Sequence, residues 1–206
     1  NTAVGFEALK LNTTGTTNTA VGGLALDANT TGSENTAVGL SALSSATTAS
    51  ENAAFGHNAL LSNTTGSGNV ALGKSAAINT TTGNNNTAVG KSAFSANTTG
   101  SQNVAVGNAA LDANTTAANN TAVGYSAAGA VTTGTNNVAM GSLALASATD
   151  ANDNTAIGYL ALQDATGSNN TALGSQAIKN VTSGTDNIGV GQQAGASITT
   201  CNTNIA

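Results

Sequence analysis

The chain repeats itself every seventeen residues, and this period limits the folds that it can adopt. The run NTAVG at residues 1–5 returns at residues 18–22, and related runs continue to the end of the chain. The units begin at Asn1, Asn18, Asn35, Asn52, Asn69, Asn86, Asn103, Asn120, Asn137, Asn154, Asn170, Asn187 and Asn202. Ten of the spacings are 17 residues, one is 16 and one is 15, and a partial unit starts at residue 202. We therefore predict one repeat domain over residues 1–206, as a segment of a longer fibre.

A period of 17 is too short for helix-pair repeats, which need more than about 30 residues, but it suits one coil of a parallel β-solenoid. Within each unit, counted from its Asn as position 1, positions 2 to 4 have strand composition. We also expect a short second strand at positions 7 to 10, and a Thr-Thr-Gly connection at positions 13 to 15. Twelve stacked coils give a rod of roughly 55–60 Å. The predicted fold class is therefore all-β.

Asn at position 1 and Gly at position 5 are the predicted corners of each coil. Glycine tolerates positive φ and close backbone approach, and Asn tolerates left-handed conformations. Stacked Asn side chains are expected to form a hydrogen-bonded ladder. The predicted corner residues are Asn1, Gly5, Asn18, Gly22, Asn35, Gly39, Asn52, Gly56, Asn69, Gly73, Asn86 and Gly90.

Position 4 is apolar in all twelve complete units, and position 3 is nearly always Ala. Because alternate strand residues face opposite sides, these two positions must point in opposite directions. We predict that the core is formed by Val4, Val21, Val38, Phe55, Leu72, Val89, Val106, Val123, Met140, Ile157, Leu173 and Val190. Contacts between chains are then predicted at Ala3, Ala20, Ala37, Ala54, Ala71 and Ala88. The alternative is that these alanines occupy a cramped coil interior.

Composition excludes several classes of function. The net charge is −5 and the four basic residues are all lysine, so no basic surface for nucleic acid is expected. No apolar stretch is long enough to span a bilayer, so no membrane insertion of this segment is expected. The small, Ala-rich core and the open sheet edges favour several rods packed side by side as a homo-oligomer.

The units NTAVGYSA (120–127), NVALGKSA (69–76), NVAVGNAA (103–110) and NTAIGYLA (154–161) resemble the head repeats of trimeric autotransporter adhesins. Similar repeats occur in phage and viral tail fibres. The resemblance implies a left-handed parallel β-roll, a homotrimer about one axis, and a place outside the cell, on a cell surface or on a virion fibre. It covers essentially the whole chain.

Few residues suggest chemistry, and no catalytic, cofactor or metal site is predicted. His57 fits an exposed, variable repeat position, and Cys201 fits a buried or interchain position better than a nucleophile. The oxygen-rich run at residues 150–154 lacks the glycine and the closing Glu of a calcium loop. Candidate glycosylation sequons, which chance also explains, begin at Asn12, Asn29, Asn63, Asn97 and Asn114.

We therefore expect a non-enzymatic structural or adhesive fibre segment. Its partners would be copies of itself and a cell-surface receptor or glycan, bound through the variable side chains at positions 6, 7, 10 and 11. Two alternatives are open: a filament subunit that stacks end to end, and an ice-binding solenoid that uses its repeated Thr-Thr pairs.

Overall fold

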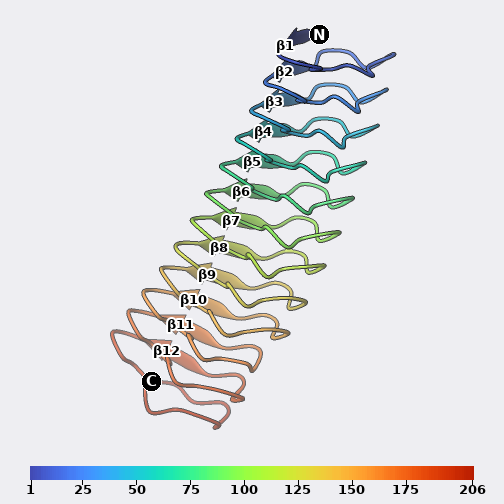
Figure 1. Cartoon of the computed structure of the whole chain (residues 1–206). Helices are drawn as coiled ribbons and strands as arrows, with labels where there is room; N and C mark the ends of the chain where they lie inside the picture. Colours follow the sequence, from blue (N-terminus) through green and yellow to red (C-terminus); the bar gives the residue numbers. More distant parts are fainter.

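A computed structural model describes all 206 residues and shows a β-solenoid, in which each unit forms one coil (Figure 1). One short strand per coil joins a single parallel sheet whose spatial order follows the sequence from β1 to β12. The strands are β1 (Thr2–Val4), β2 (Thr19–Val21), β3 (Thr36–Val38), β4 (Ala53–Phe55), β5 (Val70–Leu72), β6 (Thr87–Val89), β7 (Val104–Val106), β8 (Thr121–Val123), β9 (Val138–Met140), β10 (Thr155–Ile157), β11 (Thr171–Leu173) and β12 (Ile188–Val190). The predicted solenoid is confirmed, and no helix that could cross a membrane is present.

Equivalent repeat positions stack directly on one another. In the first pair Thr2 lies beside Thr19 and Val4 beside Val21. The register survives the 16-residue unit, because Thr155 still pairs with Thr171. The missing residue belongs to the connection, where a shortening leaves the sheet undisturbed.

The last unit differs from the prediction, because the next coil begins at Asn204 and not at Asn202. The Asn204 backbone N–H donates to Asn187 Oδ1 at 3.1 Å, and Ile205 forms a bridge with Ile188. Asn202 lies two residues earlier, where its Oδ1 accepts from the Thr185 N–H at 2.8 Å. Residues 187 to 203 are therefore a unit of the ordinary length. The start of the coil is therefore marked by the Ile205-Ala206 pair after Asn204, and not by Asn202, the first Asn that the spacing offers.

Position 3 belongs to the core and position 4 does not, so the predicted core at position 4 is wrong. The position-3 alanines from Ala20 to Ala172 are completely buried, whereas the position-4 side chains are partly exposed or exposed. The coil is so narrow that only a methyl group fits where the strand faces inward. The prediction that these alanines contact another chain is wrong for the same reason, and the cramped interior is correct. Only Ala3, in the first coil, is exposed.

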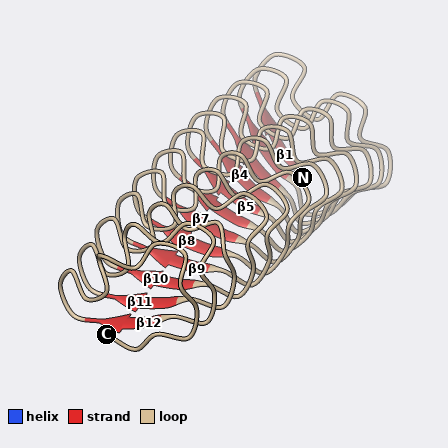
Figure 2. Cartoon of the chain, turned by 90° about the horizontal axis from the view of Figure 1, so that it is seen from below, coloured by secondary structure: helices blue, strands red, loops and turns tan.

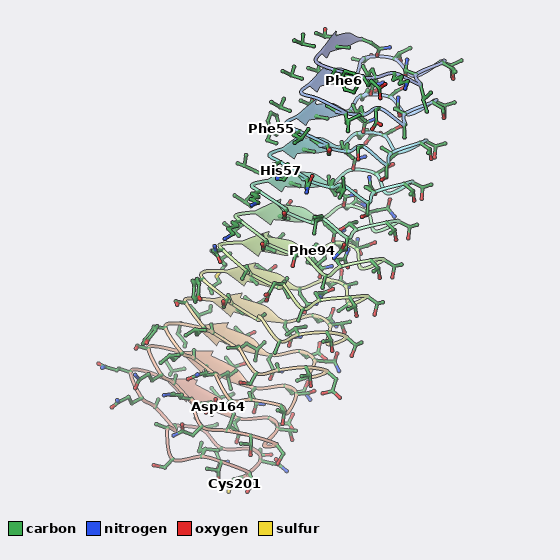
Figure 3. The ribbon with its side chains drawn as sticks, viewed as in Figure 1. Phe6, Phe55, His57, Phe94, Asp164 and Cys201 are labelled. Atoms are coloured by element: carbon green, nitrogen blue, oxygen red, sulfur yellow. The ribbon has the colours of Figure 1, made fainter.

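Positions 7 to 10 form a turn and not the predicted second strand. Residues at positions 7 and 9 have left-handed backbones, as at Glu7 (φ 56°) and Leu9 (φ 54°). The Lys10 N–H donates to the Glu7 carbonyl, and the Leu9 N–H donates to Ala25 of the next coil at 3.0 Å. This alternating backbone turns both position 8 and position 9 inward, which a strand could not do. Position 9 supplies the largest buried side chains, including Phe94, which lies within the coil in Figure 3.

The predicted glycine corners are confirmed, whereas the left-handed backbone expected at the Asn corner lies at the preceding residue, as at Thr17 (φ 61°) and Glu34 (φ 62°). Gly at position 5 has φ between 125° and 138° in every complete unit, a region open only to glycine. The position-1 Asn residues from Asn18 to Asn187 are buried and form the expected ladder. Asn18, for example, donates its backbone N–H to Asn1 Oδ1 and its Nδ2 to the Gly32 carbonyl.

Candidate functional site

The long sides of the rod are the candidate sites, because the surface has no pocket and no group of three His, Cys, Asp or Glu side chains lies together. Figure 2 shows the equivalent parts of successive coils aligned in columns along the whole molecule. His57 is exposed at position 6, as predicted. Cys201 is a free, exposed thiol, so the buried alternative is wrong and the interchain alternative stays a prediction.

The first surface is the outer side of the sheet, which we call the sheet face and define as the side chains at positions 2 and 4 of the twelve coils. None of these 24 residues is charged, and position 4 is always apolar. Several are well exposed, including Leu72 at 49% and Val190 at 59%. An uncharged strip of this length on one side of a molecule is typical of an interaction surface.

A second column consists of the threonines at position 13, which is Thr in every complete unit. Except at Thr149 and Thr199, their hydroxyls donate to the equivalent carbonyl of the next coil, as Thr98 Oγ1 does to Thr115 at 3.0 Å. The position-14 threonines from Thr14 to Thr133 are exposed and make no side-chain hydrogen bond. Only one threonine of each pair is therefore available to a ligand such as ice.

The candidate sequons lie on the wrong side of the coil for glycosylation. Asn29, Asn63, Asn97 and Asn114 are all 0% exposed, and Asn12 is half-buried. Position 12 is an inner corner, where Asn29 Nδ2 donates to Gly32 at 3.0 Å and to the Asn12 side chain at 2.7 Å. A folded coil leaves no path for a glycan at the four buried sites. The Asn-Thr-Thr sequence does not predict the burial of these Asn residues, because it is equally typical of an exposed turn.

The third surface is the column of side chains at position 6, which we call the position-6 ridge. It follows the corner glycine at the end of each strand, and Figure 3 shows His57 near Phe55 at this edge of the rod. Its members are Phe6, Gly23, Leu40, His57, Lys74, Lys91, Asn108, Tyr125, Ser142, Tyr159, Ser175 and Gln192. The composition of the ridge is unusual in this chain, because it holds both tyrosines, the only histidine and two of the four lysines.

Charges elsewhere on the rod are few and mostly unpaired. The single ion pair joins Lys10 Nζ to Glu7 Oε1 at 2.8 Å. Burial raises the pKa of Asp27 and that of Asp112 above the ordinary carboxyl value, although bonds from backbone N–H groups act in the opposite direction. Both carboxyls lie at position 10 of their coils, where they are half-buried. Neither has a basic partner close enough for an ion pair.

No protein-family model, no curated protein and no solved structure matches this chain. Its function must therefore be argued from the three surfaces themselves.

Proposed function

We propose that this chain is a non-enzymatic structural fibre segment that acts outside the cell or on a virion, as a homotrimer of side-by-side solenoids. The observation that carries the proposal is the sheet face. Twenty-four outward side chains without a charge form a strip roughly 55 Å long on one side of each rod. Copies that turn these strips toward a common axis would remove them from water.

The composition of the sheet face favours burial against copies of the same chain. Position 4 carries Val in seven coils and Phe, Leu, Met or Ile in the others. Burial of apolar surface contributes about 25 cal/mol per Å², so a long strip supplies a large total even where each contact is weak. The inner core is almost entirely Ala and Leu. A single rod is stabilised only by burial of this core, whereas a bundle would also be stabilised by burial of the sheet faces.

The resemblance of the repeats to trimeric adhesin heads and tail fibres supports the number three and the extracellular setting. Because the position-3 alanines are buried within the coil, we propose the sheet face as the contact between chains instead. Backbone hydrogen bonds run between every pair of neighbouring coils, with 133 in the whole chain. Such a ladder suits a stiff rod that holds or presents an attachment surface.

The test is the mass in solution of the wild type and of Val89→Lys, measured by light scattering across a dilution series. Val89 lies in β6, near the middle of the sheet face, where it is partly exposed. The wild type is expected at three times the 19.6 kDa chain mass. The variant is expected at the chain mass, because a lysine buried between rods lacks a partner.

Thr99→Lys is the matched control, since Thr99 belongs to the same coil but is exposed on the connection. It should leave the trimer intact. A wild-type protein that is monomeric at all concentrations would overturn the proposal. A concentration-dependent series of larger species would instead favour the end-to-end filament.

A further inference from the structure

The position-6 ridge concentrates residue types that are rare in this chain. Five of the seven Tyr, Lys and His residues of the whole sequence occupy it. The other variable positions hold mostly Ala, Ser, Asn and Asp. Nothing in the coil requires such residues at position 6, because glycine and serine occupy it elsewhere in the same column.

The ridge is ordered along the rod. His57, Lys74 and Lys91 occupy three consecutive coils, Asn108 the next, and Tyr125 and Tyr159 lie farther toward the C-terminal end. Neighbouring coils are about 4.8 Å apart, so the row from His57 to Tyr159 is roughly 29 Å long. All six side chains are exposed, with Tyr125 at 58% and Tyr159 at 51%.

The backbone holds this row in a fixed register. Each of these position-6 carbonyls accepts a hydrogen bond from the N–H at position 7 of the next coil. The Ser75 N–H donates to His57 at 2.9 Å, and the Ser92 N–H donates to Lys74 at 3.0 Å. The same bond joins Gln176 to Tyr159 at 2.8 Å. The side chains are therefore presented at regular intervals on a rigid base, which lowers the entropic cost of binding.

The two stacked lysines have no acidic partner. The chain's only ion pair is Lys10 with Glu7, several coils away. Like charges at equivalent positions of neighbouring coils repel each other, so Lys74 and Lys91 carry a local cost that an external anion would remove. A ligand that neutralises both must place negative groups along the rod axis.

We propose that the position-6 ridge binds an acidic polysaccharide that lies along the rod. The lysines would receive its carboxylates, and Asn108 and His57 can hydrogen-bond to sugar hydroxyls. The tyrosine rings combine an apolar face with a polar hydroxyl, which suits stacking on a pyranose ring. Such contacts are weak singly but add along a chain. The inference rests on the attachment role proposed above and assigns its ligand class.

A nucleic acid fits the ridge less well. Two lysines and one histidine on a rod of net charge −5 fall short of the basic surface that phosphate backbones require. The test below includes duplex DNA so that this outcome is visible.

The experiment measures binding of the full chain to immobilised polygalacturonate, with neutral dextran as the uncharged reference. The wild type should bind polygalacturonate and not dextran. The double variant K74Q/K91Q should weaken binding by at least about tenfold. The matched control K10Q/K179Q removes the same charge away from the ridge and should bind like the wild type. Y125A/Y159A should also weaken binding, without changing the net charge.

Three outcomes would overturn the inference: no binding of the wild type, equal loss in both lysine variants, or duplex DNA that competes as well as free polygalacturonate. The far-UV spectrum and the solution mass of each protein are recorded in parallel. A monomer that still binds through Lys74 and Lys91 would overturn the trimer and keep the ridge. A trimer that does not bind polygalacturonate would overturn the ridge proposal and leave the trimer proposal intact.

Discussion

At the scale of single residues, side-chain volume inside the coil is balanced between neighbouring units. Phe94 is the largest fully buried side chain, and the coil before it has Ala77 at the same position. Ile178 offers a second case. A Cβ added to Gly189 would lie 2.5 Å from Ile178 Cγ1, so the one glycine at position 3 makes room for a branched neighbour. A large buried side chain in one coil is thus accommodated by a small residue in a neighbouring coil.

The corner glycines are the residues least open to change. Gly73 has φ +138°, and a Cβ added to it would lie 2.6 Å from the Gly90 carbonyl oxygen. We expect Gly73→Ala to lower the free energy of unfolding by about 2–3 kcal/mol, because neither backbone can shift without disturbing the stack. Urea denaturation at fixed protein concentration measures this.

Gly23→Ala provides the comparison. Gly23 lies directly after a corner, and an added Cβ there meets only Leu40 Cδ1 at 3.4 Å. A change within about 0.5 kcal/mol is expected. Equal effects of the two substitutions would show that the corner geometry is not the constraint.

At the scale of elements, the position-1 Asn ladder connects the strand to the connection of the same coil and to the coils on either side. Asn86 donates its backbone N–H to Asn69 Oδ1 at 2.9 Å and its Nδ2 to Gly100 at 2.9 Å. Its own Oδ1 accepts from the Asn103 N–H at 3.0 Å. One side chain therefore satisfies backbone groups of two coils, all of them shielded from water.

Removal of one member should show the value of the ladder. Asn86→Ala leaves the Gly100 carbonyl and the Asn103 N–H without these partners, and a loss of about 2–4 kcal/mol in the free energy of unfolding is expected. Asn108→Ala, at an exposed position without a side-chain hydrogen bond, should change it by less than about 0.5 kcal/mol. If Asn86→Ala were as stable as Asn108→Ala, the ladder would be incidental to folding.

At the scale of the whole molecule, each coil pairs only with the coil before it and the coil after it. Stability in such an array is close to a sum over coils and their interfaces. The length of the rod is then set by the number of units, and the three surfaces extend or shorten with it.

This independence predicts that a complete unit can be removed. Deletion of residues 86–102 joins two coils in the original register, so the fold should persist and the longest dimension should fall by about 5 Å. Small-angle scattering and the far-UV spectrum measure both. Deletion of residues 86–93 alone removes β6 and leaves residues 94–102 without a complete coil, so a larger loss of stability is expected at this junction. A complete-unit deletion that unfolds as readily as the half-unit deletion would contradict the nearest-neighbour picture.

Much of the architecture was readable from the sequence, because a solenoid needs the same residue at the same place in every coil. The period placed the strands at positions 2 to 4, and the invariant Gly and Asn marked the two corners. The sequence also carried the signal for the last coil, in the Ile-Ala pair after Asn204, but spacing from the nearest Asn obscured it.

The tertiary structure alone decided which side of each strand faces inward. Alternation says only that positions 3 and 4 are opposed, and apolarity made Val4 and its equivalents look like core. The narrow space under the strand reverses that choice, since only a methyl group fits at position 3, while the larger buried side chains come from position 9. Left-handed turns at Leu9 and its equivalents were likewise hidden, because leucine disfavours that backbone in isolation. Stacking against neighbouring coils imposes it, and in doing so leaves the apolar sheet face and the position-6 ridge outside.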